Sequence, residues 1–143
     1  MTEPIIDRPI AERLLAAARE AAERAYAPYS RFPVGAAVLT TDGSVITGCN
    51  VENASYGLTI CAERVAAVSA IAAGHRSIVA VAVTAPRATR VTPCGACRQV
   101  LNEFKLPGQD LVVILDGVDG PELVPLSDLL PHAFGPRDLP DGR

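Results

Sequence analysis

Three cysteines and one glutamate form the pattern with the clearest chemical meaning in this 143-residue chain. Glu63 follows Cys61 by two positions, and further along the chain Cys94 and Cys97 stand three positions apart. Three thiolates can hold one zinc ion, and a catalytic zinc site keeps its fourth position open for water, whereas a structural site fills that position with a protein ligand. The pattern therefore predicts an open zinc site beside a carboxylate, which is typical of a hydrolytic enzyme.

Glu63 is the candidate for moving protons at such a site. Zinc can lower the pKa of a bound water from about 15.7 to roughly 7, and a nearby carboxylate can accept the proton and pass it on. Positions two apart on a regular helix do not face one another, so this role requires Cys61 to lie in an irregular first turn. Arg64 and Arg98 are candidates to offset the negative charge of the thiolates, and Arg64 is the better candidate for direct contact with a sulfur.

The cysteine pattern leaves two other classes of protein open. Cys49 stands apart from the cluster, and we expect a buried core thiol there, because free cysteine is among the most buried residue types. A closed, non-catalytic zinc module would instead recruit Cys49 or His75 as a fourth ligand. A thiol redox protein would use residues 94–97 alone, but such a motif usually follows a strand in a βαβ unit and needs neither the first cysteine nor the glutamate.

Length, composition and charge narrow the classes of partner. The chain is 49% hydrophobic, which predicts a single folded domain over residues 1–143. Its start does not resemble an export signal and its apolar runs are too short to cross a membrane, so we expect a cytoplasmic protein with reduced thiols and no membrane partner. The net charge is −3 with no basic cluster, which argues against a nucleic-acid polymer as partner. A small uncharged substrate fits better.

Hydrophobic patterning predicts the elements that position these residues. An amphipathic helix over 9–25 has an apolar face made of Leu14, Leu15, Ala18, Ala22 and Ala25. Strands are expected over 34–40, 45–49, 77–84 and 110–115, helices over 61–73 and 94–104, and a short helix over 126–130 within a proline-rich carboxyl-terminal cap. An Asp-Gly turn joins the first two strands. Both helices that begin with cysteines offer a positive dipole end that favours thiolates. The order predicts a mixed sheet in a three-layer α/β/α domain.

Segments 61–64 (Cys-Ala-Glu-Arg) and 93–99 (Pro-Cys-Gly-Ala-Cys-Arg-Gln) resemble the signature of the small homotetrameric cytidine deaminases. Zinc deaminases in general use a ligand set of this kind with a glutamate that is not a ligand. Further similar segments are 26–32, 34–36, 48–57 and 129–134, so the resemblance covers most of residues 25–139.

The resemblance implies an α/β fold with a mixed five-stranded sheet and one Zn2+ per chain. It implies that Cys61, Cys94 and Cys97 are the metal ligands and that Glu63 is the catalytic proton carrier. The implied activity is hydrolytic deamination of cytidine and deoxycytidine to uridine and deoxyuridine with release of ammonia, as in pyrimidine salvage. A deaminase of another cytosine nucleoside, such as a blasticidin-type antibiotic, has the same cysteine pattern and is the nearest alternative.

The resemblance also implies the contacts to a nucleoside substrate. Asn50 and Glu52 would hydrogen-bond the ribose hydroxyls, and Phe32 would pack against the pyrimidine. Phe134 would reach the site from a neighbouring subunit, so a homotetramer is expected.

Overall fold

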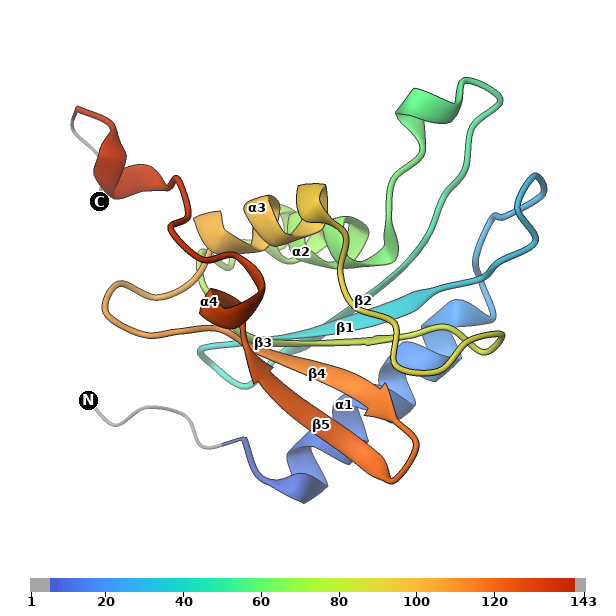
Figure 1. Ribbon diagram of the computed structural model, residues 1–143, viewed down its shortest axis with the longest axis horizontal. Helices are drawn as coiled ribbons and strands as arrows, with labels where there is room; N and C mark the ends of the chain where they lie inside the picture. Colours follow the sequence, from blue (N-terminus) through green and yellow to red (C-terminus); the bar gives the residue numbers. More distant parts are fainter. Residues whose placement is uncertain (1–5, 141–143) are drawn as a thin grey trace.

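A five-stranded mixed sheet runs through the computed structural model, which describes residues 6–140 (Figure 1). The strands are β1 (Gly35–Thr40), β2 (Val45–Cys49), β3 (Ile78–Thr84), β4 (Val112–Gly117) and β5 (Gly120–Pro125). The helices are α1 (Arg8–Ala22), α2 (Ala62–Ala72), α3 (Gly95–Glu103) and α4 (Leu126–Leu129), with short 3₁₀ turns η1 (Tyr56–Leu58) and η2 (Pro136–Asp138).

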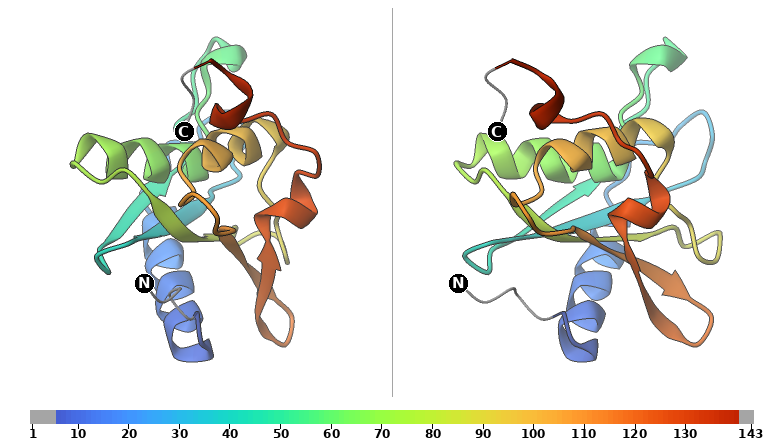
Figure 2. Two further views of the ribbon diagram at one scale, coloured as in Figure 1. Left: turned by 90° about the vertical axis from the view of Figure 1, so that its left-hand side faces the viewer. Right: turned by 60° about the vertical axis from the view of Figure 1, so that its left-hand side comes forward.

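Two crossover connections produce the strand order β2-β1-β3-β4-β5: α2 lies in the connection from β2 past β1 to β3, and α3 lies in the connection from β3 to β4. β3 pairs in parallel with β4, and every other neighbouring pair is antiparallel. A parallel pair needs a long connection, and here that connection contains α3. All seven residues of β3 are buried, because this central strand is covered by helices on both sides. The predicted three-layer α/β/α arrangement is confirmed (Figure 2).

One face of the sheet is covered by α1. The helix begins at Asp7, whose side chain accepts a hydrogen bond from the backbone N–H of Ile10 at 2.9 Å, the capping interaction expected of aspartate. Leu14 and Leu15 are each 1% exposed and pack against β1, β3 and β4. The predicted apolar face of this helix is therefore the one that packs on the sheet.

The opposite face is covered by α2 and α3, which lie side by side in both views of Figure 2. α2 presents only small side chains to the sheet, and its alanines at positions 62, 66, 67 and 70 are fully buried. Gly48 of β2 lies directly beneath it: a Cβ atom there would be 2.4 Å from the backbone nitrogen of Ala66. The close approach fixes where α2 begins, which is where the first cysteine lies.

Two sequence predictions about the elements are wrong. The carboxyl-terminal region contains β5 in addition to the expected short helix. Prolines at both ends of β5 obscured it, and the strand tolerates them because it is an edge strand. The first helix ends at Ala22 rather than near residue 25, because the backbone N–H of Tyr26 donates to the oxygen of Asn50 at 3.0 Å and draws the chain into a bridge with Val51. Among the described residues, no helix combines the length and apolarity needed to span a membrane.

Candidate metal and active site

Two helix starts bring the three cysteines together. Cys61 is the N-cap of α2 and Cys94 is the N-cap of α3, both with extended backbone, and Cys97 lies in the first turn of α3. The three Sγ atoms lie within 4.8 Å of one another, and the Sγ atoms of Cys61 and Cys94 are 3.8 Å apart. Two sulfurs on a tetrahedral zinc ion are about 3.8 Å apart, given Zn–S bonds of about 2.3 Å. The donor set fits zinc in chemistry and in spacing.

Within residues 6–140, no further cysteine, histidine or carboxylate joins this group. The Cys49 thiol instead donates to the oxygen of Arg24 at 3.5 Å. His75 lies beside the Asp42 carboxylate, with 3.9 Å between Nδ1 and Oδ1. Neither of the two residues considered as a fourth ligand is therefore part of the cluster, and the position remains open for another ligand.

The two arginines next to the cysteines have different surroundings. The Arg64 Nη2 atom lies 3.5 Å from the Cys61 Sγ atom, and this contact is the main reason that the pKa of Arg64 is raised. Its Nε atom is buried and has no hydrogen-bond partner in the described chain, so an anionic group beside it would remove the cost of an unsatisfied donor. Arg98 donates to the backbone oxygens of Pro93 at 2.7 Å and Leu129 at 2.8 Å. It braces the loop before α3 rather than the sulfurs.

Glu63 lies in the first turn of α2 with only 4% of its surface exposed. Burial raises its pKa, and this outweighs the opposing effects of its own backbone N–H and of the Arg64 charge. Its charge also reaches Cys97: burial raises the pKa of the Cys97 thiol, and the neighbouring Glu63 carboxylate raises it further. A buried carboxylate with a raised pKa, whose charge reaches a thiol of the cluster, is suited to carrying protons at this site.

The Cys94 thiol behaves in the opposite way to the Cys97 thiol. Burial acts to raise its pKa, but hydrogen bonds from the backbone N–H and side chain of Cys97 and from the Cys61 side chain outweigh it, and the pKa is lowered. Unpaired backbone N–H groups at the start of a helix favour a thiolate in this way. The start of α3 therefore favours the thiolate form of Cys94.

Asn50, a predicted substrate contact, holds the segment that leads into β1. It is 8% exposed. Its Oδ1 atom accepts from the backbone N–H of Val34 at 2.9 Å, and its Nδ2 atom donates to the backbone oxygen of Phe32 at 2.9 Å. The position of Phe32, the predicted pyrimidine contact, is therefore linked directly to Asn50.

Glu52, the other predicted ribose contact, is bound to the same segment. Its carboxylate accepts from the backbone N–H groups of Tyr29 at 3.0 Å and Ser30 at 3.1 Å, and from the Ser30 hydroxyl. The Ser30 hydroxyl bond is the largest cause of its lowered pKa. A cavity of about 240 Å³ opens beside it, lined by Tyr29, Ser30, Glu52, Tyr56 and Thr59.

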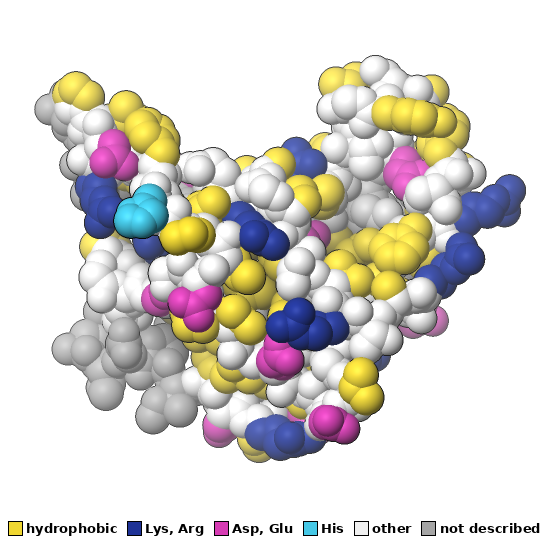
Figure 3. Space-filling model, in the orientation of Figure 1, with side chains coloured by type: hydrophobic (Ala, Val, Ile, Leu, Met, Phe, Trp, Pro, Cys, Tyr) yellow, Lys and Arg dark blue, Asp and Glu magenta, His cyan; other side chains and the backbone are white. Residues whose placement is uncertain are grey.

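Phe134 lies on the carboxyl-terminal segment and is 57% exposed. Its backbone oxygen accepts from Gln99 Nε2 at 2.9 Å and from Asn102 Nδ2 at 3.1 Å. Figure 3 shows the surface hollowed between this segment and the projecting segment around η1. Sequence reasoning missed both α3 side chains; their spacing of three places them on one helix face, but their target on a distant segment cannot be read from it.

The fold and the thiol cluster together define a zinc-binding deaminase. Residues 9–114 match the family model described as the cytidine and deoxycytidylate deaminase zinc-binding region, and the chain belongs to this family. It is 51% identical over 131 residues to a cytidine deaminase of Halalkalibacterium halodurans, covering 91% of this chain and 98% of the relative. A cytidine deaminase of Mycobacterium tuberculosis is 48% identical over 126 residues, covering 88% of this chain and 90% of the relative.

Solved structures agree with this assignment. A cytidine deaminase from Burkholderia pseudomallei superimposes with a TM-score of 0.77 at 50% identity, over 85% of this chain and 97% of that one. One from Mycobacterium tuberculosis gives 0.75 at 47% identity, over 86% and 95%. A cytidine deaminase from Bacillus anthracis, at 18% identity and a TM-score of 0.70 over 87% of this chain and 89% of that one, shows likeness of fold alone. The chain is a zinc-dependent enzyme of the deaminase family, as the motifs predicted.

Proposed function

We propose that the protein catalyses the hydrolytic deamination of cytidine and deoxycytidine to uridine and deoxyuridine, with release of ammonia. The observation that carries the proposal is the group of three thiols within 4.8 Å of one another beside a glutamate that is 4% exposed. Relatives named cytidine deaminases, among them one with 51% identity over 91% of the chain, support the choice of substrate. The reaction belongs to pyrimidine salvage.

Cys61, Cys94 and Cys97 hold one Zn2+ in this proposal. When bound, the ion supplies a Lewis acid that makes water a nucleophile near neutral pH. Arg64 lies against Cys61, where its charge offsets the excess negative charge of three thiolates, so that the site keeps its ability to acidify water.

Glu63 carries the protons. Its carboxylate accepts a proton from the attacking water and donates one to N3 of the pyrimidine while a bond forms from oxygen to C4. It then takes the proton of the new C4 hydroxyl and delivers it to the departing amino nitrogen, so that C4 becomes a carbonyl as the C4–N bond breaks and ammonia leaves. The burial that raises its pKa supports this role, because a proton carrier works best when its pKa is near the working pH.

Glu52 and Asn50 bind the ribose hydroxyls in this proposal. A carboxylate has about four lone-pair positions, and Glu52 already accepts from two backbone N–H groups and one hydroxyl, which leaves room for a sugar hydroxyl. Its lowered pKa keeps it negatively charged. A fixed negative charge at this place disfavours a phosphate on the sugar, so we expect nucleosides rather than deoxycytidylate as substrates.

Phe32 packs against the base, and Phe134 completes the site of a neighbouring subunit in a homotetramer. Exposed apolar side chains on two segments, η1 and the carboxyl-terminal segment, support assembly. Tyr56 is 75% exposed and Leu58 65% in η1, and Phe134 is 57% exposed in the carboxyl-terminal segment. Exposed apolar groups gathered on projections are typical of interaction surfaces. The net charge of −3 supports a small nucleoside rather than a nucleic-acid polymer as partner, and we place the enzyme in the cytoplasm.

The direct test is to incubate the zinc-loaded protein with cytidine and to measure uridine and ammonia. We expect equal amounts of both products from the wild type. Glu63→Gln should keep its zinc and lose turnover by about 10²-fold to 10⁴-fold, the usual contribution of a general acid–base group. Glu23→Gln, at an exposed position after α1, is the matched control and should be unchanged. Near-normal turnover by a zinc-loaded Glu63→Gln protein would contradict the mechanism.

The same assay separates the substrates. Deoxycytidylate and a blasticidin-type nucleoside should both be turned over far more slowly than cytidine. If deoxycytidylate were preferred, the role given to the Glu52 charge would be wrong; if the antibiotic were preferred, the alternative substrate class would replace the nucleoside.

A further inference from the structure

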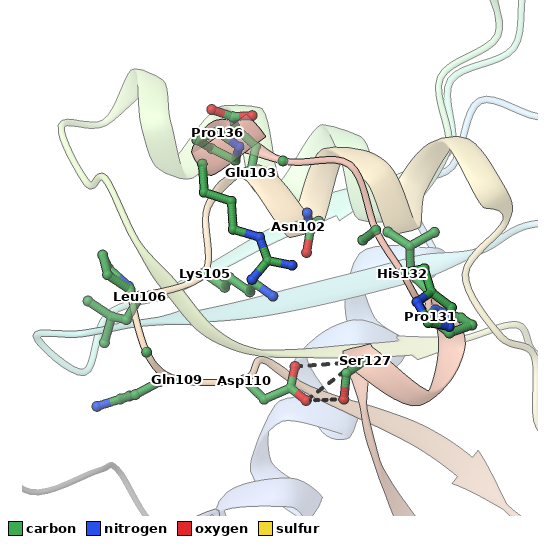
Figure 4. A pocket seen from close by; sticks show the side chains of 16 residues that line it. Asn102, Glu103, Lys105, Leu106, Gln109, Asp110, Ser127, Pro131, His132 and Pro136 are labelled. Atoms are coloured by element: carbon green, nitrogen blue, oxygen red, sulfur yellow. Dashed lines mark hydrogen bonds between the residues drawn. The ribbon is translucent and has the colours of Figure 1, made fainter. Parts of the chain in front are cut away.

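A cavity of about 600 Å³ lies away from the thiol cluster, beneath the carboxyl-terminal segment. Its walls are the carboxyl-terminal half of α3, the loop 104–110 and residues 130–137 (Figure 4). None of the cysteines or proposed substrate contacts lines it. Its volume falls within the range of about 300–1,000 Å³ that is usual for small-molecule sites.

Asn102 is the most informative residue in this cavity. It is 6% exposed, and its Nδ2 atom donates to the backbone oxygen of Phe134. Because that partner can only accept, the amide orientation is fixed. No residue between 6 and 140 donates a hydrogen bond to its Oδ1 atom, and Figure 4 shows this atom directed into the cavity. It is therefore an accessible acceptor, to which a ligand or water in the cavity can donate.

Basic side chains line the same cavity. Lys105, the only lysine in the sequence, is half-buried and makes no ion pair with any residue between 6 and 140. His132 lies across the cavity from it in Figure 4, and Arg137 also lines the space. Partly burying a cation without a partner costs free energy, which an anionic ligand would recover.

Two carboxylates, those of Glu103 and Asp110, also line the cavity. Asp110 is committed elsewhere, because it accepts from the backbone N–H of Leu111 at 2.9 Å and from the Ser127 hydroxyl at 2.5 Å. Glu103 is an exposed residue at the end of α3. The remaining lining includes apolar side chains such as Leu106 and Leu130, which suit the body of an organic molecule.

We propose that this cavity binds a small organic phosphate that also carries hydrogen-bond donors. Its phosphate lies against Lys105 and Arg137, and one of its hydroxyl or N–H groups donates to Asn102 Oδ1. Because the same Asn102 side chain holds the backbone of Phe134, the ligand acts on the segment that Phe134 occupies. That effect on turnover rests on the proposed function, whereas the binding itself does not.

The single lysine allows a selective test. Reductive methylation with ¹³C-formaldehyde labels Lys105 and the chain's amino terminus, and the methyl resonances of Lys105 can be followed by NMR. Ribose 5-phosphate is the probe, with ribose and inorganic phosphate as separate arms. We expect a saturable shift with ribose 5-phosphate and a much weaker response to the other two. No saturable shift overturns the site, and an equal response to inorganic phosphate overturns the organic class of ligand.

Calorimetry on unlabelled protein tests the residues. Lys105→Gln should weaken the binding of ribose 5-phosphate by at least about tenfold, the loss expected for a charge-assisted hydrogen bond, and Lys105→Arg should restore most of it. Arg13→Gln, an exposed change on α1, is the matched control and should bind normally. Equal affinity for Lys105→Gln and the wild type overturns the assignment.

The link to Phe134 is tested by measuring cytidine turnover with and without saturating ribose 5-phosphate. We expect a change in KM of at least about twofold, with Lys105→Gln insensitive to the ligand. Unchanged kinetics with a saturated site overturns the coupling. A protein that binds the ligand but deaminates no nucleoside contradicts the proposed function and leaves the binding site intact.

Discussion

The helices that cover the two faces of the sheet have different roles. α1 packs its side against one face through large side chains such as Leu14 and Leu15, and neither of its ends takes part in the thiol cluster. α2 and α3 cover the other face, and it is their starts that gather Cys61 and Cys94. One face therefore contributes mainly stability, and the other combines packing with chemistry.

The difference between the two faces shows what a metal site requires of the surrounding fold. Thiols must be placed to within a few tenths of an ångström, so the helices that carry them must be fixed along their axes as well as against the sheet. α2 achieves this with alanines and a contact to the backbone at Gly48. Small residues allow the backbones of the helix and the strand to come into direct contact. Because no long side chain with several rotamers lies between them, the position of the helix start can vary less.

Removing a thiol from the α2–α3 face tests most directly whether that face carries the chemistry. Cys97→Ala should reduce bound zinc from one ion per chain to nearly none, and turnover should fall by more than about 10³-fold, because several kcal/mol of transition-state stabilisation are lost. Metal analysis and the cytidine assay measure both effects. Cys49→Ala, whose thiol contacts the oxygen of Arg24 instead, should keep zinc and activity. Zinc loss in the Cys49 variant would mean that the site is closed.

A second prediction uses the glycine on each face. A Cβ at Gly35 would lie 1.8 Å from the oxygen of Ala18 in α1, and one at Gly48 would lie 2.4 Å from the nitrogen of Ala66 in α2. Replacing either glycine by alanine should destabilise the protein by about 3 kcal/mol, with Gly35→Ala the worse of the two. Only Gly48→Ala should also weaken zinc binding, because it displaces the helix that begins at Cys61.

Urea unfolding and zinc competition with a chelator measure these two effects. Gly57→Ala is the control, since a Cβ there meets nothing within 4 Å, and it should change neither. If Gly35→Ala weakened zinc binding as much as Gly48→Ala does, the two faces would not be separable in the way described.

The sequence predicts the thiol cluster well because its geometry is largely local. A cysteine at a helix start has an extended backbone and unpaired N–H groups nearby whatever the rest of the fold, and the spacing of Cys94 and Cys97 within one turn is set by the helix. Only the meeting of the two helix starts depends on tertiary structure. Four of the five strands follow from runs of β-branched and apolar residues in the same local way.

Features that depend on distant partners could not be predicted from the residues. Arg98 is adjacent to the cluster in sequence, yet its guanidinium donates to Leu129 in the carboxyl-terminal region. Glu52 and Asn50 are linked to residues of the segment before β1, which no spacing rule indicates. β5 is a partial exception, because Asp119-Gly120 is a turn signal of the same kind as Asp42-Gly43 and marks the hairpin that leads into it.

A polar contact between α1 and the end of β4 should contribute less to the free energy of unfolding than the glycine contacts do. Asp116 at the end of β4 accepts from Arg19 Nη2 at 2.8 Å and from the Thr84 hydroxyl at 2.7 Å. Burial acts to raise its pKa, but the bonds from Arg19 and Thr84 outweigh it, and the pKa lies below the ordinary value. Asp116→Asn should lower the free energy of unfolding at pH 7 by about 1–2 kcal/mol.

The pH dependence follows from the direction of that shift. A carboxyl whose pKa is lower in the folded than in the unfolded chain stabilises the fold above the unfolded value of about 3.9, and this stabilisation is lost as pH falls through the folded value. The difference between wild type and Asp116→Asn should therefore be full at pH 7 and shrink below about pH 4. Urea unfolding at both values checks it, and Arg19→Gln should remove much of the difference at pH 7. A difference that stayed constant with pH would contradict this prediction, because the charge of the Asp116 carboxylate would then contribute nothing to holding α1 against the sheet.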